Sequence, residues 1–207
     1  MKAAIIGIHT GIGKTISSAV LCEALEADYW KPVQAGSLEN TDSDIIRKLI
    51  SNFRTVIHPE GYRLTAAMSP HAAGKIDGVE VNIKSMKLPA TNNHLIIETA
   101  GGLMSPVSNK HTNLDAVMHF GVPVILISQN YLGSINHTLL TLKALKAHEV
   151  KVLGVMFNGN ENIDSQDYIT GYFKVPVLGR INYRRNLNKE AIQIEAQNIR
   201  LEIEKYF

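Results

Sequence analysis

An α/β fold of three layers, with a mostly parallel central sheet and helices on both faces, is the fold class that this 207-residue sequence predicts. The first observation is that short apolar runs alternate with segments of helical periodicity along most of the chain, which favours a parallel sheet covered by helices. The second is that a glycine-rich turn joins the first apolar run to the first helical segment. Because the length suits one domain, we expect residues 1–207 to form a single domain.

In chain order, six apolar runs are predicted to be strands: residues 2–8, 28–33, 94–99, 122–128, 151–157 and 175–180. Helices are predicted at residues 15–25, 44–51, 113–120, 135–147 and 166–173. The final segment, 188–207, places Ile192, Ala196, Ile199 and Ile203 near one helical face. We expect that helix to pack on the sheet rather than to bind a partner. Ligands of such folds gather at the carboxyl ends of the strands.

Composition excludes several classes of function. Lys and Arg total 21 against 19 Asp and Glu, so no excess of charge indicates nucleic acid or an anionic membrane as the main partner, and we expect a small ligand. The single cysteine, Cys22, rules out an intramolecular disulfide and a cysteine-rich zinc site. No apolar run reaches membrane-spanning length and the N-terminus starts directly with a strand, so we expect a cytoplasmic location.

The turn after the first predicted strand reads GIHTGIGKT, residues 7–15, and fits the phosphate-binding loop template of Gly, four residues, Gly-Lys-Thr. Glycines let backbone N–H groups turn inward around an anion, and a helix N-terminus adds partial positive charge. Lys14 is predicted to reach the β- and γ-phosphates, and the Thr15 hydroxyl to hold Mg²⁺. A turn whose glycines serve only the backbone has no need of this Lys-Thr pair. The sequence therefore predicts a nucleotide site in a P-loop NTPase fold.

Two segments after the second predicted strand add candidates. Lys31 ends that strand, and a lysine at this edge of the sheet is predicted to stabilise charge on a transferring phosphoryl group; alone, such a lysine is more often a solvated surface charge. Asp42 and Asp44 precede the next helical segment. One of them is expected to cap the helix, and the other to bind Mg²⁺, which takes one or two acidic ligands. We assign Asp44 to the metal and keep Asp42 in reserve.

The third predicted strand ends in Glu98 and continues into the small residues Thr99-Ala100-Gly101-Gly102. A carboxylate at the end of an apolar strand is typical of the Walker B arrangement. Because an unpaired buried charge is costly, we expect Glu98 to face the metal. Farther along, the amide of Asn158 is suited to read an adenine edge, although Asn158-Gly159 is equally typical of a plain turn.

Together these motifs closely resemble the dethiobiotin synthetase family, ATP-dependent carboxylases that close the ureido ring in biotin synthesis. The resemblance covers nearly the whole chain and rests on TGIGKT, KPVQAGS, the SDI aspartate, SPHAA, ETAGGLMSPVS, LGSINH and VMFNGN, in the family's order. Other P-loop enzymes share the first motif but lack the KPV lysine and the LGSINH segment.

The resemblance implies a role for each matching residue. Lys14 and Lys31 would be the catalytic residues, holding phosphate and carbamate oxygens, and Thr15, Asp44 and Glu98 would contact Mg²⁺. ATP would meet Thr10, Gly11, Ile12, Gly13, Lys14, Thr15, Ile16, Asp44, Glu98, Thr99, Ala100 and Gly101 along the phosphates, and Asn158, Gly159 and Asn182 near adenine. The organic substrate would meet Thr10, Lys31, Ala35, Gly133, Ser134, Ile135 and Asn136.

The same resemblance implies the reaction and the assembly. One amine of 7,8-diaminononanoate takes up CO₂, supplied as CO₂ or bicarbonate, and the resulting carbamate attacks the γ-phosphate of MgATP. The neighbouring amine then displaces phosphate and closes the ring. The family is a homodimer with its active site at the interface, where the helix start at residues 133–137 of the other subunit meets the substrate carboxylate, a site that a helix N-terminus favours.

Three positions depart from the family pattern. Ala35 stands where a small hydroxyl residue is usual, which puts one substrate contact in doubt. Thr99 replaces the usual glycine after the metal-binding glutamate and is expected to add a side chain beside the phosphates. Asn182 stands where a proline often lies near the base, which would loosen the selectivity for adenine.

Two other classes of function remain open. Another ATP-dependent amide-forming ligase, of the cobyrinate amidase type, would need a glutaminase domain with a nucleophilic cysteine, and this chain has neither the length nor a suitable Cys. A partitioning or switch ATPase usually carries a second lysine early in the phosphate loop, where this chain has Ile8-His9-Thr10. Its terminal helix often seeks membranes, whereas the last helical segment here mixes charges of both signs.

Overall fold

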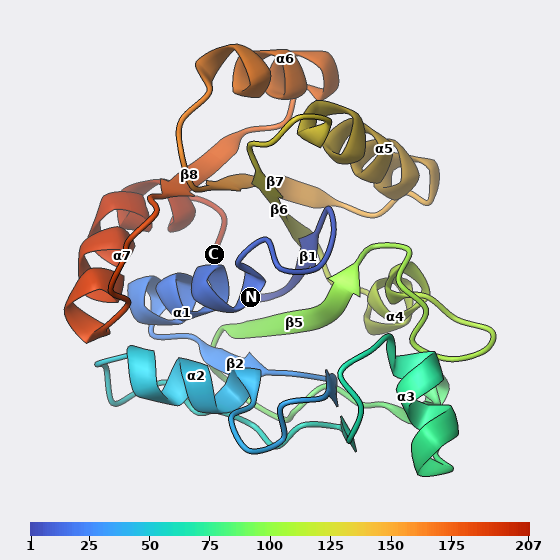
Figure 1. The fold of residues 1–207 in the computed structure, drawn as a ribbon. Coiled ribbons are helices and arrows are strands. Elements are labelled where there is room, and N and C mark those ends of the chain that lie inside the picture. Colours follow the sequence, from blue (N-terminus) through green and yellow to red (C-terminus); the bar gives the residue numbers. More distant parts are fainter.

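The computed structural model describes residues 1–207 and is built around one six-stranded sheet, all of whose neighbouring strands are parallel (Figure 1). The strands lie in the order β2-β5-β1-β6-β7-β8. Their bounds are Asp28–Trp30 for β2, Leu95–Gly102 for β5, Lys2–Gly7 for β1, Val124–Gln129 for β6, Val152–Asn158 for β7 and Val177–Ile181 for β8. The predicted three-layer α/β fold is therefore confirmed.

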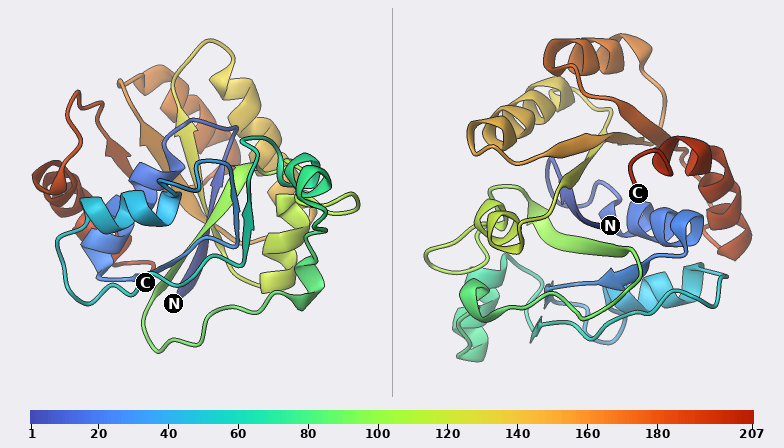
Figure 2. Two further views of the ribbon diagram at one scale, coloured as in Figure 1. Left: turned by 60° about the horizontal axis from the view of Figure 1, so that its bottom comes forward. Right: turned by 180° about the vertical axis from the view of Figure 1, so that it is seen from behind.

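Helices cover both faces of the sheet. On one face lie α1 (Lys14–Leu25), α2 (Asp42–Leu49) and α7 (Lys189–Ile203), which share one apolar cluster with the sheet. On the other face lie α4 (Asn113–Phe120), α5 (Ser134–Ala147) and α6 (Ile163–Phe173), which share a second cluster. Figure 2 shows the two helical layers with the bottom of the molecule turned forward and from behind. The predicted packing of the last helix on the sheet is confirmed, because Ile192, Ala196, Ile199 and Ile203 are all buried in the first cluster.

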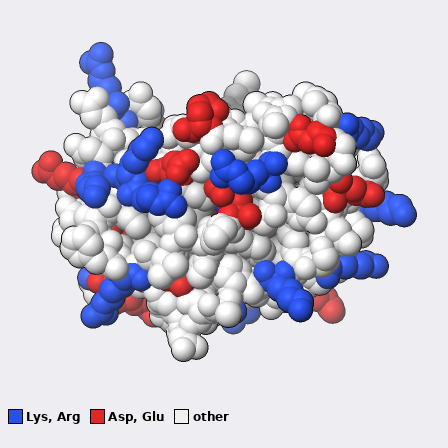
Figure 3. Space-filling view, turned by 90° about the horizontal axis from the view of Figure 1, so that it is seen from below, with Lys and Arg blue, Asp and Glu red and all other residues white.

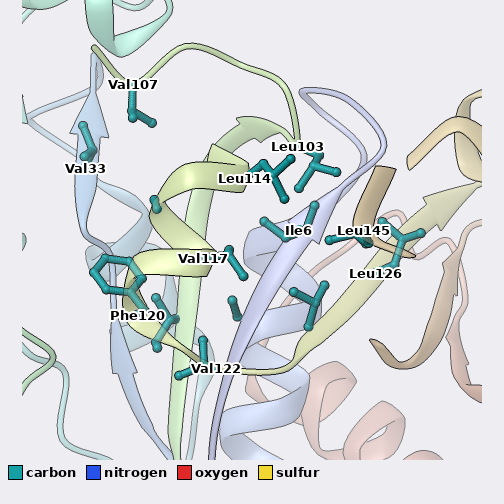
Figure 4. Close-up of a cluster of buried hydrophobic side chains, with 14 of the residues drawn as sticks. Ile6, Val33, Leu103, Val107, Leu114, Val117, Phe120, Val122, Leu126 and Leu145 are labelled. Carbon is teal, nitrogen blue, oxygen red and sulfur yellow. The ribbon is translucent and has the colours of Figure 1, made fainter. Parts of the chain in front are cut away.

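Strand β1 shows why the sheet needs cover on both sides. Ala3 and Ile5 point into the cluster under α1, whereas Ala4 and Ile6 point into the cluster under α4 and α5, and all four are fully buried. In Figure 4, Leu114, Val117 and Phe120 of α4 project toward the sheet that carries Ile6. Each such side chain stabilises the fold by about 1.5–3 kcal/mol through its burial. A strand apolar on both faces is typical of the centre of a parallel sheet.

Four short elements escaped the sequence prediction. The predicted strand 28–33 is interrupted at Lys31-Pro32 and resumes as β3 (Val33–Ala35), which pairs with β4 (Tyr62–Leu64) in a separate two-stranded sheet. The interruption follows from Pro32, which has no backbone N–H to donate to a neighbouring strand. Helix α3 (Pro70–Asp77) and a 3₁₀ turn (Ile83–Ser85) follow. The first of these begins at a proline, a common first residue of a helix.

The surface carries charges of both signs. On the face shown in Figure 3, lysine and arginine side chains are interspersed with aspartate and glutamate. None of the helices combines the length and the apolar character required to cross a bilayer.

Candidate nucleotide site

The phosphate loop connects β1 to α1, and two of its glycines have left-handed backbones. Gly11 has φ 78° and Gly13 has φ 88°, conformations that residues with a Cβ adopt only at a cost. Gly13 is the N-cap of α1, and no side chain bonds to the first turn of that helix. The N–H groups at the start of α1 are thus directed toward the cavity side of the loop, as an anion requires.

Asn158, at the end of β7, braces this loop from behind. Its Nδ2 donates to the carbonyl of Ile12 at 2.6 Å, and its Oδ1 accepts from the hydroxyl of Ser17 at 3.3 Å. A Cβ on Gly13 would come within 2.5 Å of Asn158 Nδ2, so any larger residue there would displace this amide. The structure thus gives this amide a bracing role that the sequence did not indicate, while its predicted contact with adenine stays a prediction.

Two lysines and three oxygen-bearing side chains meet beside the loop. Lys31 Nζ lies 2.5 Å from Asp42 Oδ2 and 3.0 Å from Glu98 Oε1. The Thr15 hydroxyl donates to Glu98 Oε1 at 2.9 Å and lies 3.1 Å from Asp42 Oδ1. Lys14 Nζ donates to the carbonyl of His9 at 3.3 Å within the loop. The two adjacent strands β2 and β5, together with the first residues of α1 and α2, supply this cluster.

Burial makes the electrostatics of the cluster strong. Desolvation lowers the pKa of Lys14 to about 8, although Glu98 acts in the opposite direction. Desolvation also acts to lower the pKa of Lys31, but the charges of Glu98 and Asp42 outweigh it and raise that pKa above its ordinary value. For Asp42, desolvation acts to raise the pKa, and the charge of Lys31 outweighs it and lowers that pKa. At neutral pH, Lys31 is therefore an ammonium held between two carboxylates.

The assignment of Asp44 to this cluster is wrong, because the structure places Asp42 there instead. Asp44 is the third residue of α2, and its Oδ2 accepts from the backbone N–H of Thr41 at 3.1 Å and from the Thr41 hydroxyl at 3.0 Å. Its Oδ1 accepts from Arg47 at 2.6 Å. Together with the bond from Asp44 N to the Thr41 hydroxyl, this is a complete capping box. The pattern Thr-x-x-Asp was the signal that could have identified Asp44 as the cap.

Thr99 also differs from its prediction. Its side chain is buried and its hydroxyl donates to the carbonyl of Ile5 at 2.9 Å. The side chain therefore links β5 to β1 and does not lie beside the phosphates. The carbonyl of Thr99 accepts from Lys31 Nζ at 3.4 Å. A β-branched residue can occupy this position because its hydroxyl is bonded to the neighbouring strand.

Sequence reasoning missed two polar residues behind the cluster. Gln34 is buried, accepts from the backbone N–H of Asp42 at 3.3 Å and donates to the carbonyl of Gly36 at 3.0 Å, so it fixes the start of α2. Tyr29 is fully buried, and its hydroxyl donates to Glu98 Oε2 at 3.0 Å. Tyr29 precedes Lys31 by two residues on a strand, so the spacing already placed both side chains on one face.

One cavity of about 640 Å³ collects most of the predicted site residues. Those that line it are Thr10, Gly11, Gly13, Lys14, Thr15, Ile16, Lys31, Ala35, Glu98, Ala100 and Gly101, together with Asp42. The side chain of Ile12 is buried in the core behind the loop, and Asn182 is exposed just after β8. Gly133, Ser134, Ile135 and Asn136 line a different cavity, of about 980 Å³, at the start of α5.

The donor set of the cluster fits Mg²⁺. The set has three oxygen-bearing side chains. The hydroxyl of Thr15 lies within hydrogen-bond distance of the carboxylates of both Asp42 and Glu98. Both carboxylates also pair with Lys31 Nζ. Mg²⁺ prefers oxygen ligands, and beside phosphates it takes only one or two carboxylates from the protein. The structure contains no cluster of three or more His, Cys, Asp or Glu side chains suited to a metal, so the set lacks the multiple protein ligands of a zinc site.

Solved structures share the fold at low sequence identity. The septum site-determining protein MinD of Pyrococcus horikoshii, complexed with Mg-ADP, is 15% identical with a TM-score of 0.57, and the match covers 100% of this chain and 96% of that one. A plasmid partition protein of Borrelia burgdorferi is 16% identical with a TM-score of 0.56 and 100% of each chain covered. These likenesses show the P-loop NTPase fold alone.

Curated relatives are much more similar in sequence. The ATP-dependent dethiobiotin synthetase BioD of Christiangramia forsetii is 44% identical, with 95% of this chain and 94% of the relative covered. The proteins of the same name from Cytophaga hutchinsonii and Chlamydia pneumoniae are 46% and 42% identical, with 92% and 93% of this chain and 93% and 86% of the relatives covered. A family model described as an AAA domain matches residues 2–191. This chain belongs to the family of ATP-dependent dethiobiotin synthetases.

Proposed function

We propose that this chain uses MgATP to carboxylate 7,8-diaminononanoate with CO₂ and to close the ureido ring, which yields dethiobiotin, ADP and phosphate. The observation that carries the proposal is the position of Lys31. Its ammonium lies in the same cavity as the phosphate loop and is held by two buried or half-buried acids. A fixed positive charge at this place suits an oxygen nucleophile that attacks the terminal phosphorus. The family relationship supports the choice of substrates.

The residues at the site would act by position and charge. The loop N–H groups and Lys14 would hold the triphosphate, and Lys31 would face the carbamate oxygen as it bonds to the γ-phosphorus while ADP leaves. The second amine would then attack the carbamate carbon, and phosphate would leave with the bonding electrons. Thr15, Asp42 and Glu98 would hold Mg²⁺, which neutralises phosphate charge when bound. No protein nucleophile is required in either step.

A homodimer is part of the same proposal. The cavity at the start of α5 lies apart from the phosphate-loop cavity and shares no lining residue with it. Gly133 is the N-cap of α5, and no side chain bonds to the first turn, so that turn suits a carboxylate. In the proposed dimer this helix start meets the substrate tail bound at the partner's phosphate loop. A cytoplasmic location also belongs to the proposal, because ATP is supplied there.

The experiment measures product and phosphate together. Purified protein is incubated with 7,8-diaminononanoate, bicarbonate and MgATP, dethiobiotin is quantified by mass spectrometry, and phosphate by a coupled assay. We expect one phosphate for each dethiobiotin and almost no phosphate when the diamine is omitted. Phosphate release that does not depend on the diamine would instead favour a switch or partitioning ATPase. The dimer is tested by light scattering, which should give twice the 22.8 kDa of the chain.

A further inference from the structure

Glu98 has a contact that the proposed chemistry does not use. One carboxylate oxygen, Oε1, accepts from Thr15 at 2.9 Å and from Lys31 at 3.0 Å, both of which line the cavity. The other oxygen, Oε2, accepts from the hydroxyl of Tyr29 at 3.0 Å. Tyr29 is absent from the cavity lining and is fully buried. The second carboxylate oxygen is therefore held by a buried group that does not line the cavity.

The backbone fixes the geometry of this grip. On β2, Tyr29 is the register partner of Ile96 on β5, so Glu98 lies two residues farther along the same face of the adjacent strand. The ring of Tyr29 is packed in the apolar cluster under α1 and α2. A close-packed ring has little freedom to swing, and its hydroxyl is thereby held at one place relative to β5.

The hydroxyl of Tyr29 is not explained by packing of the apolar core. A phenylalanine would fill the same apolar volume, and a buried hydroxyl costs free energy unless it is hydrogen-bonded. The one hydrogen bond of the Tyr29 hydroxyl is the one that it donates to Glu98. A bond to a charged acceptor is among the stronger ones in proteins. It restricts rotation of the carboxylate about its last torsion, which is otherwise broad, and keeps Oε1 turned toward Thr15.

We propose that Tyr29 is a positioning residue, which orients the Glu98 carboxylate so that Oε1 faces the Mg²⁺ of bound MgATP. The inference rests on the proposed function, since it takes from there the role of Glu98 as a metal ligand. Groups that orient a metal ligand usually contribute 10- to 100-fold to metal affinity. The hydroxyl of Tyr29 thus acts through Glu98 and touches no reacting atom.

The test is Tyr29→Phe, which removes the hydroxyl and keeps the ring. Binding of Mn²⁺ in place of Mg²⁺ is measured by electron paramagnetic resonance with the protein saturated with ADP, a readout that does not require turnover. We expect the dissociation constant for Mn²⁺ to rise about 10- to 100-fold. In the assay of dethiobiotin formation, the half-saturating Mg²⁺ concentration should rise by a similar factor, while kcat at saturating Mg²⁺ should change much less.

The matched control is Tyr62→Phe, because the Tyr62 hydroxyl accepts only from the backbone N–H of Asn82, away from the cavity. It should leave Mn²⁺ affinity unchanged. Unaltered Mn²⁺ affinity in Tyr29→Phe, equal weakening in both variants, or a Tyr29→Phe protein that no longer folds would each overturn the positioning role. Glu98→Gln separates the two proposals: if it leaves Mn²⁺ affinity intact, the assignment of Glu98 to the metal fails. If it weakens affinity and Tyr29→Phe does not, only the role of Tyr29 fails.

Discussion

Replacing Lys31 with methionine tests how much the buried cluster depends on its ammonium. The side chain of Lys31 is 4% exposed and that of Glu98 is 1% exposed, whereas that of Asp42 is 25% exposed. Methionine keeps most of the length of the side chain and removes the charge, which leaves two carboxylates facing each other. Removing one partner of a buried ion pair costs about 3–5 kcal/mol. Because water reaches Asp42 and relieves part of this cost, we expect a loss of about 3 kcal/mol in the free energy of unfolding.

The assay is urea denaturation at pH 7 followed by circular dichroism, in EDTA and again with Mg²⁺ but no nucleotide. We expect Lys31→Met to be less stable than the unchanged protein in EDTA. Mg²⁺ should then recover more stability in Lys31→Met than in the unchanged protein, since a divalent cation can replace the missing ammonium between the two acids. In the separate assay with 7,8-diaminononanoate, bicarbonate and MgATP, dethiobiotin formation by Lys31→Met should fall by roughly 100-fold or more, as with the loss of other preorganised charge donors.

Lys48→Met is the control for losing a lysine, because Lys48 is exposed and bonds only to Asn40. The free energy of unfolding of Lys48→Met, its change on adding Mg²⁺ and the rate of dethiobiotin formation should all equal those of the unchanged protein. If Lys31→Met were as stable as the unchanged protein in EDTA, the ammonium would not be holding the two carboxylates together. If its turnover were also unchanged, the catalytic role of Lys31 would be lost as well.

Three further predictions follow from the site and its surroundings. Asp42→Asn should raise the half-saturating Mg²⁺ concentration about ten-fold or more. Asp44→Asn should instead weaken the capping box at the start of α2 and leave the Mg²⁺ dependence intact; the reverse result would return Asp44 to the metal. Gly13→Ala should weaken ATP binding about ten-fold in calorimetry, because a left-handed backbone costs other residues about 1–2 kcal/mol and the new Cβ would press on Asn158; equal affinity would contradict this. Asp28→Asn should cost about 1–3 kcal/mol at pH 7 in urea denaturation, a difference that should shrink below pH 4 or so.

The pH dependence of Asp28 follows from its partners. Burial acts to raise the pKa of Asp28, but hydrogen bonds from Thr91, Val56 and Asn93 outweigh it and lower that pKa. A carboxylate whose pKa is lowered by folding stabilises the fold above its unfolded pKa and loses this contribution as the pH falls through the folded value. A stability difference that stayed constant down to acid pH would contradict this.

Gly78→Ala is the control for Gly13→Ala, since Gly78 has φ +67° but open space around its Cβ position.

The sequence predicted the sheet, most of the helices and the phosphate loop because each of these leaves a local pattern. Glycine spacing identifies the loop, and apolar runs identify buried strands. Local pattern did not predict which of Asp42 and Asp44 faces the cavity. Both acids lie in the first turn of the same helix, and which one faces the cavity depends on the residue at which the helix begins. Boundaries shift by a residue or two in any sequence-based prediction, and here two residues decide the question.

Other misses have a tertiary cause. Tyr29 looks like any aromatic residue of a buried strand, and its role becomes visible only when β5 is placed beside β2. Thr99 was predicted to lie beside the phosphates because it directly follows Glu98, where the family usually has glycine. The alternation of side chains along β5 instead places its hydroxyl against the carbonyl of Ile5. The strands β3 and β4 have three residues each, too few for a period to be recognised.

The cluster around Lys31 is assembled from four segments that are far apart along the chain. Lys31 directly follows β2, and Glu98 belongs to the neighbouring strand β5. Thr15 and Asp42 lie in the first turns of α1 and α2. The proposed binding of Mg²⁺ and the triphosphate draws on all four segments, so we expect a chain in which α2 had detached to keep its phosphate loop and yet be inactive. Ligand binding must in turn clamp both helices onto the sheet by mass action. Slower amide exchange at the start of α2, far along the chain from the phosphate loop, would be the mark of a loaded enzyme.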